Sequence, residues 1–407
     1  MSGPDRDVTV DEAPGGASVT HRGSRFDERS DAASADRGAS SEAAAEGLEP
    51  GAGGVDATVA GWFDRSASSG IASAVAIPVL ATAFALVVGA VLIAWIGSDP
   101  VSVYADVVDG VVRAPRGFSD TATTATPVLL IALGYAFAYR ARVFTIGAEG
   151  QYLLGAVAAV GAVTAPGVRD LPAAVLVLLG LVVGALAGAA WSALSGVLHV
   201  RFGASIVISS LMLVYIAQAT LQWANRVGIR DPDSFVPASR QVGGAALPEI
   251  PWIDTHAGFA IALAVVPVMA WVLARHRLGY RVRALGDNAE ALDANEVSAN
   301  RVVVIVLVVS GALAGLAGFV EIAGVNGRLN DSASLGYGFT AIVVALVGRL
   351  HPVGVLVAAL ALAALDIGFE VAARSSDLPT SMAGLVQVLV VVFVVAGDAV
   401  HERWSAT

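Results

Sequence analysis

The chain of 407 residues contains no cysteine and no lysine. Without cysteine it has no disulfide, no thiolate metal site and no cysteine nucleophile. A P-loop needs a lysine that reaches the β- and γ-phosphates of a nucleotide, so this chain has no ordinary Walker A site. If ATP drives its work, another subunit must hydrolyse that ATP.

Charged residues are also scarce, at 14% of the chain against about 25% in soluble domains, while hydrophobic residues reach 56%. The apolar residues fall into ten runs, several of them near the 20 residues that cross a bilayer. The composition predicts an all-α polytopic membrane protein with about ten transmembrane helices. The runs lie at about 71–96, 121–139, 147–165, 171–198, 204–224, 258–274, 302–324, 338–350, 352–372 and 379–399.

The segments outside these runs complete the expected organisation. Residues 1–69 are rich in Ala, Gly, Ser and acids, and are predicted to form a disordered acidic cytoplasmic tail. A transmembrane domain is expected at 70–400 and a short C-terminal tail at 401–407. The net charge of −10 argues against nucleic acid as a partner.

Arginines indicate how the helices alternate across the membrane. With the N-terminus inside, each short inside loop carries arginine: Arg140, Arg142, Arg201, Arg275, Arg277, Arg281, Arg283, Arg301, Arg349 and Arg403. The outside arginines are diluted among acids or lie in long loops. Both termini are therefore expected in the cytoplasm.

Small residues recur at every fourth position in two of the runs. One series is Gly184, Gly188, Ser192 and Gly196, and the other is Gly311 and Gly315 with Gly318 beside them. A helix face without bulky side chains lets two backbones approach closely. We expect each of these faces to make a close contact inside a tight bundle.

No arrangement of residues points to catalysis. The six histidines lie in the tail, in loops or at helix ends, and none forms a metal-ligand motif, so no metal is expected. Glu321, Asp366 and Glu370 lie near the outer ends of their runs, where they either face water or line an outward-opening vestibule. No charge is placed convincingly at mid-membrane, which disfavours a secondary transporter.

The longest inside connection, residues 273–302, opens with an arginine cluster and is predicted to break at Gly286. Asp287 or Asn288 is a suitable N-cap for a short helix after the break. A short helix between two membrane helices makes a compact projection that fits a groove on a soluble partner. The alternative is a solvated loop anchored by its arginines.

The stretch VFTIGAEGQYLLGAV, residues 143–157, places Glu149 between two glycines at the start of an apolar run. A carboxylate in the first turn of a helix is stabilised by the helix dipole, and it can also pair with Arg140 or Arg142. The alternative is a role at a permeation path. A catalytic acid is excluded, since the chain offers it no partner.

Several stretches, in one order along residues 75–400, resemble the permease subunits of ABC importers. The resemblance is to the simple-sugar and nucleoside branch of the branched-chain-type permeases. It is carried by VFTIGAEGQYLLGA (143–156), ASIVISSLML (204–213), YRVRALGDNAEALDANEVSANRV (280–302), SGALAGLAGFVEIAGVNGR (310–328), GYGFTAIVVALVGRLHPVGV (336–355) and VVFVVAGD (391–398). The first and fifth stretches are most similar to nucleoside-type members.

The resemblance implies roles for two groups of residues. Within the loop 275–301, coupling to the ATPase would fall to Gly286, Asp287, Asn288, Ala289, Ala291 and Ala294. The residues near the translocation path or its gate would be Thr145, Gly147, Glu149, Gly150, Gln151, Gly338 and Thr340. The chain departs from the family at Thr145, where asparagine is more frequent.

We therefore expect a plasma-membrane permease subunit without an ATPase site, which imports nucleosides or simple sugars such as ribose or galactose. The implied partners are an ATP-binding cassette subunit, a second, homologous but different permease, an extracellular substrate-binding lipoprotein and membrane lipids. This chain would bind no cofactor, because ATP and Mg²⁺ would be used by the ATPase subunits. A stand-alone transporter or channel and a membrane enzyme are the alternatives.

Overall fold

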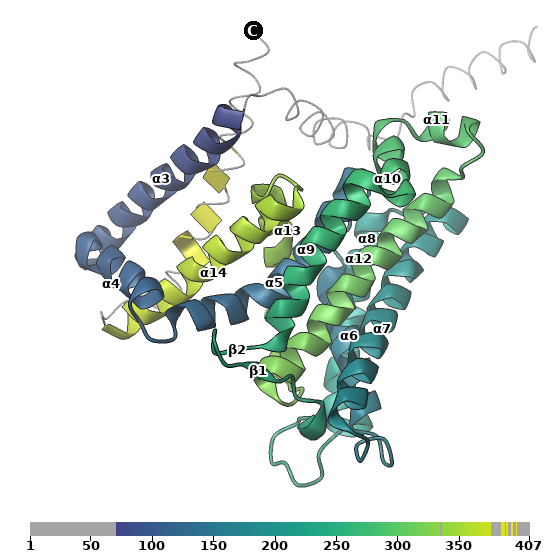
Figure 1. Ribbon diagram of the computed structural model, residues 1–407, viewed down its shortest axis with the longest axis horizontal. Helices are drawn as coiled ribbons and strands as arrows, with labels where there is room; N and C mark the ends of the chain where they lie inside the picture. The colour runs from purple at the N-terminus through teal and green to yellow at the C-terminus, as the bar shows by residue number, and fades with distance from the viewer. Residues whose placement is uncertain are drawn as a thin grey trace, which may run out of the picture. The chain divides into compact units, whose positions relative to one another are not determined.

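The computed structural model of the chain describes residues 71–333, 336–375 and a few positions between 384 and 396. The tails expected at 1–69 and 401–407 lie outside the described residues, as does most of the tenth apolar run. The described part is mostly helical (Figure 1).

Six described helices are long and apolar enough to cross a membrane. A helix rises 1.5 Å per residue, so about 20 apolar residues are needed to cross the hydrocarbon core of a bilayer. These helices confirm a polytopic membrane protein, and the expected number of about ten spans stays a prediction. They are α5 (Gly117–Arg140), α7 (Ala173–Phe202), α8 (Ile206–Trp223), α9 (Ala257–Arg275), α12 (Ala299–Glu321) and α14 (Pro352–Ser375).

The first apolar run forms α3 (Ile71–Ile96), which is followed by a helix that the run pattern missed, α4 (Pro100–Val112). Asp99 caps α4 by accepting the amides of Val101 and Ser102, and Pro100 takes the first helical position. The axes of α3 and α4 are bent by 119°, and the pair counts as a seventh span if it is taken together.

Two apolar helices are too short to span. α6 (Ala148–Val163) has 16 residues and α13 (Tyr337–Val347) has 11, which correspond to about 24 Å and about 16 Å of helix. The hydrocarbon core is about 30 Å thick, so each of these helices ends inside it or at one edge. The apolar run at about 338–350 thus forms the short helix α13.

The small-residue faces of α7 and α12 lie inside the bundle, as predicted, and the structure shows that they pack on each other. A Cβ atom on Gly188 would overlap the carbonyl of Gly311 on the opposite helix, and one on Gly315 would overlap the carbonyl of Gly184. Gly155 of α6 approaches Gly315 in the same way. The three helices therefore pack backbone against backbone, which no larger side chain would permit.

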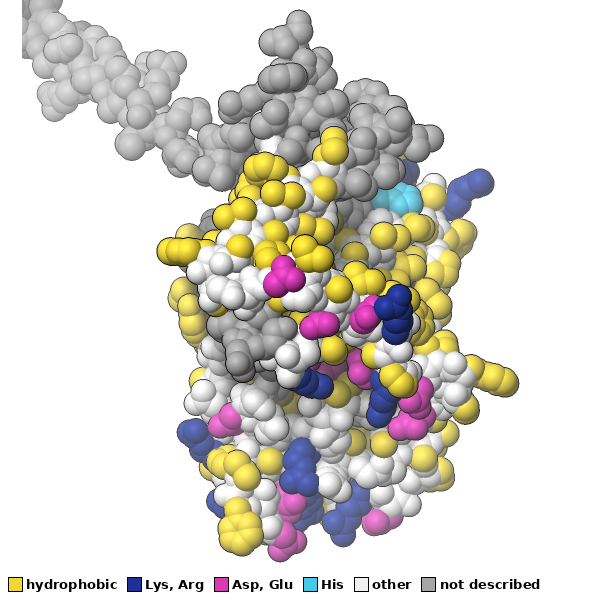
Figure 2. Space-filling model, turned by 90° about the vertical axis from the view of Figure 1, so that its left-hand side faces the viewer, with side chains coloured by type: hydrophobic (Ala, Val, Ile, Leu, Met, Phe, Trp, Pro, Cys, Tyr) yellow, Lys and Arg dark blue, Asp and Glu magenta, His cyan; other side chains and the backbone are white. Residues whose placement is uncertain are grey.

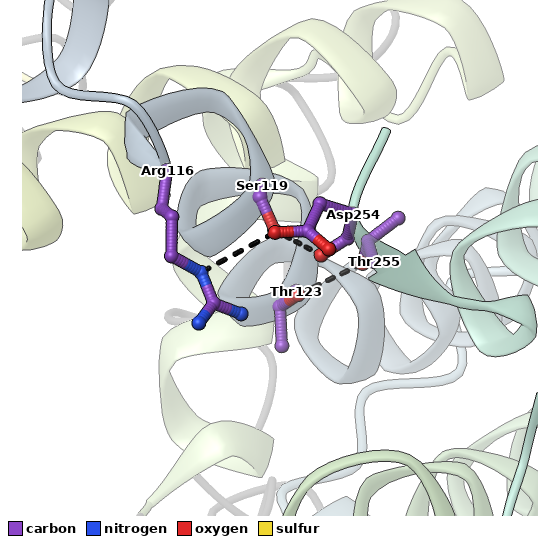
Figure 3. Close-up of polar contacts among 5 residues, drawn as sticks. All are labelled: Arg116, Ser119, Thr123, Asp254 and Thr255. Carbon is purple, nitrogen blue, oxygen red and sulfur yellow. Dashed lines mark hydrogen bonds and ion pairs between the residues drawn. The ribbon is translucent and has the colours of Figure 1, made fainter. Parts of the chain in front are cut away.

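Loops and two short strands cover the end of the bundle at which α5 and α9 begin, which we call the β1–β2 end. The strands β1 (Glu249–Ile250) and β2 (Thr255–His256) are antiparallel, with Glu249 opposite His256. The turn between them lies on α5: Ser119 donates to the carbonyl of Asp254, and the hydroxyls of Thr123 and Thr255 are 2.8 Å apart (Figure 3). The short turns η1 (Ala224–Gly228), η2 (Gly243–Ala245), η3 (Ile322–Asn326) and η4 (Asp331–Ala333) lie in the connections at this end.

Two further helices, α10 (Arg277–Asp287) and α11 (Ala289–Ala294), lie between α9 and α12 at the opposite end, which we call the α10 end (Figure 1). Among the described residues, the arginines assigned to the inside loops fall at the α10 end and those assigned to the outside loops fall at the β1–β2 end. Figure 2 shows arginine and acidic side chains intermingled at the lower end of one face, below a largely apolar surface.

Candidate translocation and coupling sites

Glu149 lies in the first turn of α6, as predicted, but its side chain is fully buried. Its Oε2 accepts the amide of Gly338 at 2.7 Å and its Oε1 accepts that of Gly336 at 3.3 Å. Gly336 is the N-cap of α13, so these amides belong to its otherwise unpaired first turn. One carboxylate thus lies at the positive ends of two short helices, and both dipoles stabilise its charge.

Two glycines are required where α13 meets this carboxylate. Gly336 adopts φ 76°, a left-handed conformation that glycine adopts without strain. At Gly338 a Cβ atom would overlap the backbone nitrogen of Glu149. The contact between the two predicted path residues Glu149 and Gly338 is therefore a direct one between the backbones of α6 and α13.

The segment before α6 is held by hydroxyl groups. The carbonyl of Thr145 accepts the Tyr139 hydroxyl at 3.0 Å, and the Thr145 hydroxyl accepts the amide of Gly147 at 3.3 Å. The amide of Ala148 donates to the Tyr135 hydroxyl at 3.3 Å. Sequence analysis missed both tyrosines, although their spacing of four residues places them on one face of α5.

Gln151 links α6 to α7. Its Nε2 donates to the hydroxyl of Ser192 at 3.1 Å, while its buried Oε1 has no hydrogen-bond partner among the described residues. Gly150 is close to the backbone of Val214 on α8, since a Cβ would lie 3.1 Å from its Cα. Thr340 is half-buried on α13. The predicted path residues thus lie where α6 meets α7, α8 and α13.

Glu321 forms a second buried polar cluster, at the end of α12. It is 3% exposed, and its Oε1 accepts Asn326 Nδ2 at 3.2 Å and lies 3.5 Å from the Tyr337 hydroxyl. The ring of Tyr337 packs edge-on against Tyr152 of α6, with centroids 5.9 Å apart. Glu370, in contrast, is exposed and pairs with Arg374 at 2.6 Å. Of the acids expected near the outer ends of their runs, Glu321 is therefore buried and Glu370 faces water.

The predicted break at Gly286 is wrong. Gly286 lies inside α10, and it is glycine because a Cβ atom would overlap the carbonyl of Arg140 at the end of α5. The break comes at Asn288, whose extended backbone (φ −159°, ψ 108°) separates α10 from α11. The arginine cluster, expected as a loop, is itself helical.

The hairpin of α10 and α11 is fixed to the bundle. Leu292 of α11 is 4% exposed, and Asp293 accepts the amide of Ala299 at the start of α12 at 2.8 Å. Asp287 is exposed at the end of α10, and the predicted coupling residues Ala289, Ala291 and Ala294 lie on α11. The described residues contain no group of three or more His, Asp or Glu side chains arranged to hold a metal ion.

A family model described as the permease component of the branched-chain amino acid transport system matches residues 117–395. The chain belongs to this permease family. Three curated relatives are ABC transporter permeases, and each alignment covers more than two thirds of this chain. No solved structure matches the chain.

The relatives differ in the solute that their names give. The chain is 33% identical to the glucose ABC transporter permease protein of Haloferax volcanii, over 79% of this chain and 87% of the relative. It is 31% identical to the guanosine ABC transporter permease protein NupP of Bacillus subtilis (80% and 94%) and 29% identical to the nucleoside ABC transporter permease protein NupB of Lactococcus lactis (72% and 83%). Each organism also has a second, less similar permease that matches this chain.

Proposed function

We propose that the chain is the membrane permease subunit of an ATP-driven ABC importer that moves nucleosides into the cell. The observation that carries the proposal is the α10–α11 hairpin, a projection between two spanning helices that is fixed to the bundle and ends in exposed residues. Family membership and the names of the relatives support the same function. The absence of lysine agrees with an ATPase on another subunit.

Contacts from the hairpin lead toward the predicted path residues. Gly286 of α10 packs on the carbonyl of Arg140, and the Arg140 Nε donates to the carbonyl of Leu350 between α13 and α14 at 3.1 Å. The other end of α13 is bound by Glu149. When the ATPase subunits close and push α11, the displacement passes through α10 to α5 and α13. The motion rocks α13 against α6, next to Thr145, Gly147, Gly150, Gln151 and Thr340, and opens the path.

The partners follow from this mechanism. A second permease completes the core, which is supported by the pairs of permease relatives in the same organisms. An ATP-binding cassette subunit uses ATP and Mg²⁺ on the cytoplasmic side, where the hairpin and both termini lie. An extracellular binding lipoprotein delivers the solute, and no cofactor binds to this chain.

Simple sugars are the second candidate substrate, because the glucose permease of Haloferax volcanii is 33% identical to this chain. The two substrate classes are separated by reconstituting this chain with its partner ATPase, second permease and binding lipoprotein. Uptake of labelled guanosine, ribose and glucose into proteoliposomes is then compared. Guanosine uptake that depends on ATP supports the proposal, and uptake of glucose or ribose alone transfers the assignment to sugars.

The coupling assignment is tested by Asp287→Arg, an exposed charge reversal on the hairpin. The matched control is Asp170→Arg, an exposed reversal at the β1–β2 end. We expect Asp287→Arg to lower uptake and substrate-stimulated ATP hydrolysis at least about 100-fold, because a partner contact of about 3 kcal/mol is lost, while insertion into the membrane is unchanged. The control should transport normally. Uptake that survives Asp287→Arg refutes the coupling role, and uptake without ATP or an ATPase indicates a secondary transporter.

A further inference from the structure

A groove of about 420 Å³ lies where α9 ends and α10 begins. Six side chains that donate hydrogen bonds, or can do so, line it. They are Arg275, His276, Arg277, Tyr280, Arg281 and Arg283. The groove opens beside the start of α10, where the positive end of the helix dipole adds to the charge of the guanidinium groups.

The arginines of this groove are not neutralised within the described part of the chain. None of the described salt bridges includes Arg275, Arg277 or Arg281. Arg283 donates to the carbonyl of Leu273, which orients its guanidinium but leaves its charge in place. Four positive charges around one hollow therefore have no carboxylate partner in the described salt bridges and can bind an anion.

The position of the groove indicates which kind of anion it receives. Arg275 is the last residue of the spanning helix α9, so the groove lies at a membrane boundary. One face of α9 leads to it and exposes Leu263, Val268 and Trp271, at 43%, 57% and 57%. The Trp271 ring lies 5.6 Å from the ring of His276, at the depth where aromatic side chains meet lipid headgroups.

We propose that the groove binds the headgroup of an anionic phospholipid whose acyl chain runs along this exposed face of α9. The phosphodiester oxygens accept charge-assisted hydrogen bonds from Arg275, Arg277 and Arg281, a geometry for which the planar guanidinium is suited. The tail covers Val268 and Leu263. A neighbouring groove of about 520 Å³ shares Tyr280, Arg281 and Arg283, but it also contains the acid Asp287, so it is less suited to an anion.

Native mass spectrometry of the full chain in detergent tests the proposal. The probes are phosphatidylglycerol and phosphatidylcholine with the same acyl chains, and inorganic phosphate alone. The variant is Arg275→Gln/Arg277→Gln/Arg281→Gln. The control is Arg113→Gln/Arg169→Gln/Arg374→Gln, which removes the same charge from arginines that pair with acids at the β1–β2 end.

We expect the wild type and the control to retain phosphatidylglycerol, and the groove variant to bind it about 100-fold more weakly, since each arginine near an anionic headgroup contributes about fivefold. Trp271→Ala should weaken binding of the lipid without abolishing it. If the triple variant does not fold, the single change Arg281→Gln still predicts about a fivefold loss.

Three results overturn the proposal. Equal binding of phosphatidylcholine removes the role of charge, and binding of inorganic phosphate as tight as that of phosphatidylglycerol makes the groove a site for free anions. Unchanged lipid binding by the groove variant, together with lost capture of the ATPase subunit, makes it a protein-docking surface. None of these results depends on which solute the permease transports.

Discussion

The two ends of the bundle use arginine differently. At the β1–β2 end five arginines each lie within 4 Å of a carboxylate, in the pairs Arg113–Asp109, Arg116–Asp254, Arg169–Asp170, Arg226–Asp331 and Arg374–Glu370. Exposed pairs of this kind contribute little to stability, at about 0–1 kcal/mol each. The carboxylates of these pairs neutralise the positive charge of the arginines at this end.

At the α10 end the arginines of the groove meet no carboxylate in the described salt bridges, and α10 packs directly on the backbone at the end of α5. Gly286 contacts the Arg140 carbonyl, and Arg140 holds the turn between α13 and α14. Unneutralised positive charge attracts anionic lipid or an acidic partner, and a rigid junction transmits a push. The α10 end is therefore suited to binding partners and transmitting their motion, whereas the β1–β2 end is a solvated surface with paired charges.

The largest effect is expected at Glu149, which joins the two short helices. Glu149→Ala leaves the amides of Gly336 and Gly338 buried without an acceptor, at a cost of roughly 1–3 kcal/mol each. Uptake should be lost, and the unfolding temperature in detergent should fall by several degrees. Glu149→Gln keeps an acceptor oxygen and should fold with reduced transport.

Equal transport by wild type and Glu149→Gln would show that the charge of Glu149 is not needed for transport and that its side chain only holds α13 against α6. Unchanged thermal stability of Glu149→Ala would show that α13 does not depend on it. Both variants are compared at the same expression level in membranes.

The start of α6 illustrates what could be predicted from the sequence. The apolar runs locate the long helices, though not α4 or α10, and the spacing of Gly184, Gly188, Gly311 and Gly315 predicts close packing of the faces that carry them, because these signals are local. Glu149 was placed in the first turn of a helix for the same reason. Its acceptance of amides from Gly336 and Gly338 was not predictable, since nothing local indicates which segment nearly 190 residues away packs against it.

The same limit applies to Gly286. A glycine between a helix-forming stretch and an N-cap residue suggests a break, whereas its actual cause is the carbonyl of Arg140 on a distant helix. Asn288, two residues later, supplies the break instead. Contacts between distant segments, rather than local helix propensities, therefore determine both the binding of α13 by Glu149 and the packing of α10 on α5.

A smaller effect is expected from adding one methyl group at each end. Gly286→Ala forces α10 away from the Arg140 carbonyl and should cost about 1–3 kcal/mol, as overpacking does. Gly244→Ala at the β1–β2 end meets only the flexible Leu176 side chain, at 3.2 Å. Uptake and unfolding temperature should fall for Gly286→Ala and hardly change for Gly244→Ala. Equal responses would show that transport does not depend on the contact between Gly286 and the Arg140 carbonyl.

The smallest effect concerns two histidines that cap helices in the same way. The Nδ1 of His256 accepts the amide of Gly258 at 3.2 Å and the Nδ1 of His276 accepts that of Leu278 at 3.1 Å, but His256 is buried and His276 is exposed. Burial lowers the pKa of His256, whose Nε2 has no partner among the described residues.

Because the folded pKa of His256 lies below the unfolded value of about 6.5, both states are neutral above that pH and stability is complete there. As the pH falls through 6.5, His256 becomes protonated in the unfolded chain but stays neutral in the folded chain, so the free energy of unfolding decreases. The unfolding temperature, measured from pH 8 to 5, should therefore decline less steeply in His256→Gln than in wild type. His276→Gln is the matched control and should keep the wild-type slope. A change of slope in His276→Gln, and none in His256→Gln, would move the pH-sensitive cap to the α10 end.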